Sequence, residues 1–127
     1  MKQKTVLYIE DNEFNRKIVR QLLARTSYQL VEAVDGEAGV AMAVQEPPDL
    51  VLMDVQLPKL SGLDATRALR AAPGTATVPI IVVTSFALSG DDVKAMEAGA
   101  SAYLAKPYSP RELMALIRRF APEEDTA

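Results

Sequence analysis

Hydrophobic residues gather in five short runs along the chain, each of a length that suits a single strand. The third and fourth runs contain only apolar residues, which is typical of strands buried on both faces of a parallel sheet. The predicted strands cover residues 5–9, about 28–34, 50–53, 78–83 and 101–105.

Between these runs, apolar residues recur with the three- and four-residue spacing of amphipathic helices. The predicted helices cover residues 12–26, 36–46, Ser61 to about Ala72, Ser89 to near Gly99, and 110–120. In the first helix the apolar stripe is Phe14, Ile18, Leu22 and Leu23, and in the last helix the inward stripe is Leu113, Leu116, Ile117 and Phe120.

Residues typical of helix ends support these boundaries. Pro47 and Pro48 stop the second helix, and Ser61 is expected to cap the third. Ser89 is expected to open the fourth helix and Gly99 to end it. The last helix begins with an N-cap serine, a first-turn proline and a capping-box glutamate, which are Ser109, Pro110 and Glu112.

Strands that alternate with helices from end to end predict an α/β fold with right-handed crossovers. We expect a doubly wound, five-stranded parallel sheet of order 2-1-3-4-5, flavodoxin-like, with three helices on one face and two on the other. The length of 127 residues suits one domain. Its core is expected at about 4–120, and residues 121–127 are expected to form a flexible acidic tail.

Polar residues follow four of the predicted strands, where an open parallel sheet binds ligands. Glu10 and Asp11 follow the first strand, Asp54 the third, Thr84 the fourth and Lys106 the fifth. In the order 2-1-3-4-5, three carboxylates would converge, and they require a proton or a cation among them. Oxygen ligands alone match a hard ion, Mg²⁺ or alternatively Mn²⁺.

Composition narrows the chemistry further. The chain has no histidine and no cysteine, which excludes Ser-His and Cys-His nucleophiles, typical zinc sites and disulfides. A net charge of −3 argues against direct nucleic-acid binding. No apolar run has the length of a membrane span and no leader resembles a signal peptide, so we expect no membrane association and a cytoplasmic location.

Asp54 is the natural nucleophile of this set, because a carboxylate can attack phosphorus to form an acyl phosphate. Phosphoryl transfer then requires positive charge around the phosphoryl oxygens. The cation and Lys106 would supply that charge, and the Thr84 hydroxyl would donate a hydrogen bond to another oxygen.

The motifs "YIEDN", "LVLMDVQLPKLSGL", "VTSFA" and "AYLAKP" resemble those of the receiver domain of two-component response regulators, of the CheY-like superfamily. The resemblance covers about residues 4–120, with every motif in order. Among receivers it is closest to single-domain regulators of the DivK type, and receivers fused to hybrid sensor kinases are also similar.

The resemblance implies that Asp54 accepts a phosphoryl group from a phosphohistidine of a sensor histidine kinase or a histidine phosphotransfer protein. It also implies that Glu10, Asp11, Asp54 and the backbone carbonyl of Gln56 hold Mg²⁺, Glu10 through water. The chain would be a signalling domain that catalyses only its own phosphorylation and slow dephosphorylation. The first acid is Glu10 rather than the commoner aspartate, which lengthens its reach.

A switch is implied as well. Lys106 would pair with the phosphoryl group and precede a cis bond to Pro107. Thr84 would move toward the phosphate and Tyr103 would swing inward behind it. Phe86 stands where many receivers have a polar residue, from which we expect slow loss of the phosphoryl group.

The family also suggests where partners bind. The kinase side would dock near Phe14, Asn15, Ile18 and the loop at 107–108, and a downstream protein would bind the face built from residues 89–120. As a free protein the chain would be a monomer or a weak homodimer.

Three other interpretations remain open at the level of sequence. The chain could be the receiver of a hybrid sensor histidine kinase. A Mg²⁺-dependent phosphatase with an aspartyl nucleophile usually has a second acid two residues after it, where this chain has Gln56. A pseudo-receiver that acts only in binding usually lacks an acid or the lysine, and this chain retains all of them.

Overall fold

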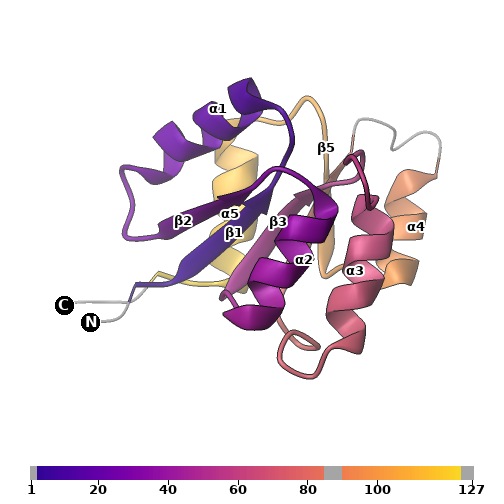
Figure 1. Cartoon of the computed structure of the whole chain (residues 1–127). Coiled ribbons are helices and arrows are strands. Elements are labelled where there is room, and N and C mark those ends of the chain that lie inside the picture. The colour runs from indigo at the N-terminus through magenta and orange to yellow at the C-terminus, as the bar shows by residue number, and fades with distance from the viewer. Residues whose placement is uncertain (1–2, 85–89, 124–127) are drawn as a thin grey trace.

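The computed structural model describes residues 3–84 and 90–123, which form a parallel sheet with helices on both faces (Figure 1). The strands are β1 (Thr5–Ile9), β2 (Gln29–Ala33), β3 (Leu50–Asp54), β4 (Ile80–Thr84) and β5 (Ala102–Ala105). Their order is β2-β1-β3-β4-β5, and every neighbouring pair is parallel. The predicted doubly wound, flavodoxin-like fold is therefore confirmed.

The ends of two strands differ from the predicted runs in a way that matters for the site. β3 and β4 each extend to include a polar residue, Asp54 and Thr84, so both side chains belong to strands rather than to loops. β4 begins at Ile80 rather than at residue 78. Pro79 has no N–H to donate to a neighbouring strand, although its carbonyl accepts a hydrogen bond from Val51 N at 2.9 Å.

The helices divide three and two over the faces, as predicted. The helices are α1 (Glu13–Leu23), α2 (Gly36–Gln45), α3 (Gly62–Ala71), α4 (Asp91–Ala98) and α5 (Pro110–Phe120). Buried residues of α1 and α5 share one hydrophobic cluster with the sheet, and those of α2, α3 and α4 share the other (Figure 1). No helix among the described residues combines the length and the apolar character needed to cross a membrane.

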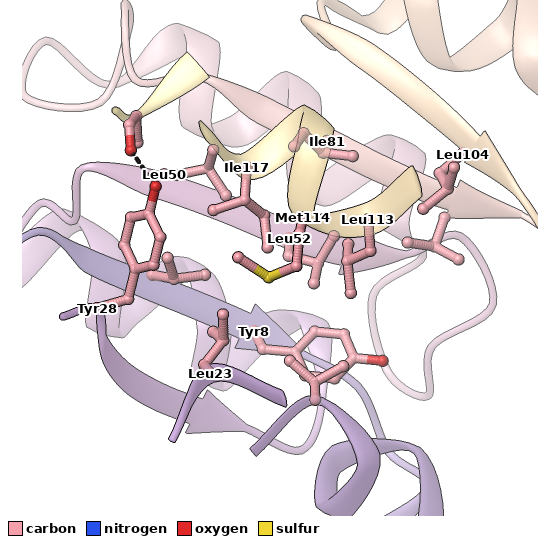
Figure 2. Close-up of a cluster of buried hydrophobic side chains, with 14 residues drawn as sticks. Tyr8, Leu23, Tyr28, Leu50, Leu52, Ile81, Leu104, Leu113, Met114 and Ile117 are labelled. Atoms are coloured by element: carbon pink, nitrogen blue, oxygen red, sulfur yellow. Dashed lines mark hydrogen bonds between the residues drawn. The ribbon is translucent and has the colours of Figure 1, made fainter. Parts of the chain in front are cut away.

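The core lies on both faces of the sheet because alternate strand residues point to opposite sides. In β1, Val6 and Tyr8 pack toward α1 and α5, whereas Leu7 and Ile9 pack toward the other layer. Figure 2 shows the first of these clusters. β3 and β4 are buried along their whole length, which places the residues at their ends in a rigid setting.

Helix capping follows the sequence where the structure describes it. Ser61 and Ser109 cap α3 and α5, and Ser109 forms the predicted capping box with Glu112. Gly99 ends α4 with a φ of 115°, in the left-handed region that favours glycine. Ser89 lies outside the described residues, and the N-cap of α4 is Gly90.

The predicted apolar stripe of α1 is partly wrong. Phe14 is 69% exposed and Ile18 is 42% exposed, whereas the buried residues of this helix are Val19 and Leu23. An α-helix has 3.6 residues per turn, so residues spaced by four, such as Phe14, Ile18 and Leu22, do not stay on one face along the helix. Val19 and Leu23 therefore face the core, and Phe14, at the start of the predicted stripe, faces solvent. In α5 the stripe is correct, but Met114 is buried with it.

The first residues of the predicted flexible tail, 121–123, contact the rest of the fold, and residues 124–127 lie outside the described residues. Ala121 is buried, and its carbonyl accepts a hydrogen bond of 2.6 Å from the Tyr28 hydroxyl (Figure 2). Glu123 accepts hydrogen bonds from Ser27 N and Ser27 Oγ and pairs with Arg118 at 3.1 Å. Ser27 and Tyr28 come from the loop before β2, and a pattern along the chain does not reveal that this loop meets the end of α5.

Candidate functional site

The carboxyl ends of the central strands bring together most of the polar residues singled out from sequence. β1 and β3 are neighbours, and β4 and β5 follow β3 in the sheet. Asp54 is paired in register with Val83, and Thr84 with Ala105. Glu10 and Lys106 directly follow β1 and β5, so they lie at the same edge.

Asp54 is held from two sides. Its Oδ2 atom lies 2.9 Å from Lys106 Nζ, and its Oδ1 atom accepts a hydrogen bond of 2.9 Å from the backbone N–H of Gln56. The residue is only 7% exposed. Both contacts stabilise an ionised carboxylate, which is the form that acts as a nucleophile.

Gly62, the first residue of α3, lets this helix approach the site closely. Its N–H donates to the carbonyl of Val55 at 2.8 Å. A Cβ atom at Gly62 would overlap the carbonyl oxygen of Asp54 and lie 2.8 Å from Val55 Cα. Any larger residue would therefore push the start of α3 away from the backbone that carries Asp54.

Glu10 is the most buried charged residue of the site, at 1% exposure. Its Oε1 atom accepts hydrogen bonds from Tyr8 Oη at 3.2 Å and Asn15 Nδ2 at 3.3 Å, and its Oε2 atom accepts one from Asn12 N at 3.2 Å. Burial, followed by the charge of Asp54, raises the pKa of Glu10 to about 7. At neutral pH this carboxyl group therefore attracts either a proton or a cation.

Lys106 provides positive charge to both acids. Its Nζ atom lies 3.7 Å from Glu10 Oε1 as well as 2.9 Å from Asp54 Oδ2. Burial by itself lowers the pKa of Lys106, but the hydrogen bond and charge of Asp54 and the charge of Glu10 outweigh it, so the pKa is raised. The lysine is therefore charged at neutral pH. The predicted cis bond between Lys106 and Pro107 is confirmed.

The two residues predicted to act as a switch, Thr84 and Tyr103, differ in their surroundings. Thr84 is fully buried at the end of β4, and its carbonyl accepts a hydrogen bond of 2.8 Å from Lys106 N. Tyr103 lies on β5 opposite Val82 and is 42% exposed. The Tyr103 ring is thus on the outside of the sheet edge, from which an inward movement would start. Phe86 lies outside the described residues.

Asp11 does not join the other two acids as the sequence predicts. Its side chain is exposed, and no three His, Cys, Asp or Glu side chains within residues 3–84 and 90–123 are placed to hold a metal ion. Like charges repel, and the ammonium group of Lys106 is directed at Asp54 and Glu10 alone. The observed convergence is therefore of two carboxylates and a lysine, and Asp11 follows Glu10 in the chain with an exposed side chain.

The donor chemistry of the site nevertheless suits Mg²⁺. Two buried carboxyl groups share one lysine, and burial followed by the charge of Asp54 raises the pKa of Glu10, so a cation beside Glu10 would favour its ionised form. Hard divalent ions with retained water ligands fit such a set.

Sequence reasoning missed three residues that support the loop after β1. Tyr8 and Asn15 contact Glu10, and Arg16 Nη1 donates to the Glu10 carbonyl at 2.8 Å. Arg16 also pairs with Glu13 at 3.2 Å and with Glu32 at 3.3 Å. The available signal was the spacing: Tyr8 lies two residues before Glu10, on the same side of the strand.

A groove between α1 and α5 adjoins the site and encloses about 550 Å³. Apolar residues line most of it, and its polar end includes Lys106. The lining residues are Asn15, Ile18, Leu22, Lys106, Pro107, Tyr108, Pro110 and Leu113. Asn15, Ile18 and the loop at 107–108 are thus next to one another, as expected of the predicted kinase-docking residues, and Phe14 is exposed on the same helix.

Comparison with known proteins identifies this arrangement. A profile of the response regulator receiver domain matches residues 6–118. The chain belongs to this receiver family. Polar-differentiation response regulator DivK of Brucella anthropi is 36% identical to this receiver over 117 residues, which is 92% of the chain and 95% of that protein.

Solved structures agree with the family. The receiver domain of a sensor histidine kinase from Pseudomonas aeruginosa has a TM-score of 0.88 and 36% identity, and covers 94% of this chain and 98% of that one. Its structure has a magnesium ion coordinated in the active site cleft. A complex from Saccharomyces cerevisiae, of the phosphotransfer protein Ypd1 and the receiver domain of Ssk1, gives a TM-score of 0.84 at 27% identity, covering 94% and 89%. This chain is thus a receiver domain of two-component signalling.

Proposed function

We propose that Asp54 of this receiver accepts a phosphoryl group from the phosphohistidine of a sensor histidine kinase or a histidine phosphotransfer protein. The observation that carries the proposal is the buried Asp54 carboxylate, held at 2.9 Å from Lys106 beside the buried Glu10. A carboxylate at the end of a strand and next to a lysine is placed to act as a nucleophile toward phosphorus.

In the transfer, a carboxylate oxygen of Asp54 forms a bond to phosphorus while the bond between phosphorus and the donor's imidazole nitrogen breaks. The electron pair of the broken bond stays on that nitrogen, and the product is an acyl phosphate on Asp54. Lys106, now paired with Asp54, is placed to follow the negative charge onto the phosphoryl oxygens. The Thr84 hydroxyl would donate to another of these oxygens.

Glu10, Asp11, Asp54 and the backbone carbonyl of Gln56 would hold Mg²⁺, with Mn²⁺ as a chemically similar substitute. When bound, the ion neutralises charge on the phosphoryl oxygens. In the structure described here Gln56 contacts Asp54 through its N–H. The magnesium ion in the Pseudomonas aeruginosa receiver supports this assignment.

The phosphodonor would dock on the groove between α1 and α5. The groove adjoins Lys106 and is lined mainly by apolar side chains, and Phe14 and Ile18 expose further apolar surface on α1. The Ypd1–Ssk1 complex supports a phosphotransfer protein as the class of partner. We place this exchange in the cytoplasm, and the free receiver as a monomer or weak homodimer.

The output would be a protein contact rather than an enzymatic activity. Phosphorylated Asp54 would draw Thr84 toward it and allow Tyr103 to move inward, which changes the face of residues 89–120 for a downstream protein. The buried Thr84 and the half-exposed Tyr103 are starting positions compatible with this movement.

Intact mass spectrometry after incubation with acetyl phosphate and Mg²⁺ tests the proposal. The wild-type receiver should gain the mass of one phosphoryl group, and Asp54→Asn should not. An equal gain in Asp54→Asn would contradict the assignment of the acceptor. Continued turnover of a phosphate ester would instead favour a hydrolase, and the absence of any Mg²⁺ binding would favour a receiver that acts only by contact.

A further inference from the structure

Glu10 has a longer side chain than aspartate, the commoner residue at this position in receivers. The greater length has a cost in conformational entropy. Glutamate has one more rotatable bond, so more conformational entropy is lost when its carboxylate is fixed in one place. A metal ligand that is not fixed beforehand binds more weakly. A receiver with Glu10 therefore needs contacts that hold this side chain.

The structure contains such contacts on a single oxygen. Tyr8 Oη and Asn15 Nδ2 both donate to Glu10 Oε1, from β1 and α1 respectively, at 3.2 and 3.3 Å. Asn12 N holds the other oxygen at 3.2 Å. The Glu10 carboxylate thus accepts hydrogen bonds from residues of both β1 and α1 without a bound ion.

Tyr8 is well suited to this task because its ring is fixed. The side chain is 1% exposed and belongs to the cluster between the sheet and α5. Figure 2 shows the Tyr8 ring at the edge of this cluster, with its hydroxyl oxygen directed away from the other labelled side chains. The core thus fixes a hydrogen-bond donor at the base of the site.

We propose that Tyr8, assisted by Asn15, is a positioning residue that holds the Glu10 carboxylate in place for the divalent cation. The proposal rests on the cation site of the proposed function and adds two residues to which the resemblance assigns no part in holding the cation. It predicts that the need for the Tyr8 hydroxyl arises from the length of Glu10. With aspartate at position 10, the carboxylate would not reach this hydroxyl, which would then matter little.

The test is calorimetric titration of the whole chain with Mg²⁺. Tyr8→Phe keeps the buried ring and removes the donor, and should weaken Mg²⁺ binding about three- to tenfold, the loss expected for one ordinary hydrogen bond. Asn15→Ala should act in the same direction. Tyr28→Phe is the matched control, because it also removes a buried hydroxyl, bonded to the Ala121 carbonyl at 2.6 Å, from the same cluster. It should leave Mg²⁺ affinity within about twofold of wild type.

The decisive measurement is the double-mutant cycle with Glu10→Asp. Removing the Tyr8 hydroxyl in the Glu10→Asp background should change Mg²⁺ affinity by less than about twofold, whereas a purely structural effect of Tyr8→Phe would be equal in both backgrounds. Equal effects, or unchanged affinity in Tyr8→Phe alone, would overturn this inference and leave the phosphoryl-acceptor proposal standing. A wild-type chain that binds no Mg²⁺ would overturn both.

Discussion

At the scale of single residues, the site is a balance between two buried carboxyl groups and one lysine. Asp54 has the closer contact with Lys106, at 2.9 Å against 3.7 Å for Glu10. Glu10 is also the deeper of the two, so its ionised form is the less favoured. The charge state of Glu10 therefore responds to pH in the physiological range.

This balance predicts how stability depends on pH in the absence of divalent cations. The pKa of Glu10 is raised from its ordinary value of 4.5 to about 7 in the fold, so between these values the folded chain keeps a proton that the unfolded chain has lost. The contribution of Glu10 to the free energy of unfolding should be greatest below about pH 4.5, fall as pH rises, and level off above about pH 7.

Glu10→Gln provides the comparison, since its side chain does not titrate. Urea unfolding with EDTA should show wild type losing on the order of 2 kcal/mol relative to Glu10→Gln between about pH 4.5 and 7. Mg²⁺ should restore the wild type at pH 7 and have less effect on the variant. A difference between the two proteins that is constant with pH would contradict the raised pKa.

At the scale of elements, the ends of α3 and the turns around it position the site and the adjoining face. The N-terminal residue of α3 touches the backbone of Asp54, and its last turn carries Arg70. Arg70 donates to the carbonyls of Gly99, at 2.8 Å, and Val78, at 2.6 Å. One helix thus connects the backbone of Asp54 with the end of α4 and the loop before β4.

Gly62→Ala should disturb the N-terminal end of this helix. The added methyl group overlaps the Asp54 carbonyl, so the free energy of unfolding should fall by about 2 kcal/mol and phosphorylation by acetyl phosphate should slow. Gly74→Ala is the control, because a Cβ there meets only Pro47 Cγ at 3.5 Å. Equal stability of the two variants in urea unfolding would show that the close approach at Gly62 is not needed.

Arg70→Ala should disturb the C-terminal end of α3. It leaves part-buried carbonyls of the loop before β4 without their donor, so we expect a loss of about 2 kcal/mol in thermal or urea unfolding. Arg67→Ala, three residues earlier, removes only an exposed ion pair with Asp64 and should cost less than about 1 kcal/mol. The reverse ranking would disprove the role given to Arg70.

At the scale of the whole molecule, the parallel sheet links the acceptor to a distant face. Asp54, Thr84 and Tyr103 lie on the neighbouring strands β3, β4 and β5, within a sheet whose central strands are buried. A buried, close-packed sheet deforms little, so a change at Asp54 is expected to pass through the ends of these strands.

Thr84→Ala separates phosphorylation from this change. The variant keeps Asp54, Lys106 and the metal ligands, so it should still gain one phosphoryl group by mass. Without the hydroxyl, the amide NMR shifts of the face containing Tyr103 should change much less on phosphorylation than in wild type. Full shift changes in Thr84→Ala would rule out coupling through this residue.

Much of this architecture is readable from sequence, because periodicity and turn residues act locally. The apolar runs predict the strands, and Ser61 and Ser109 predict where two helices begin. The positions after the strands predict Glu10, Asp54 and Lys106 as neighbours. The exposed start of the α1 stripe was not predictable, since Phe14 and Val19 are both apolar and only packing decides which is buried.

The sequence by itself determined the strand and helix types, their alternation and the residues at the strand ends, because these depend on spacing within one segment. Only the tertiary structure decided which atoms meet: Lys106 with Asp54 across 52 positions, Glu123 with Ser27 across 96, and the Tyr8 hydroxyl with Glu10 rather than with solvent. Such contacts depend on how separate elements pack and on which charged groups become buried, because a buried charge is stable only when it is paired. No local pattern contains that information.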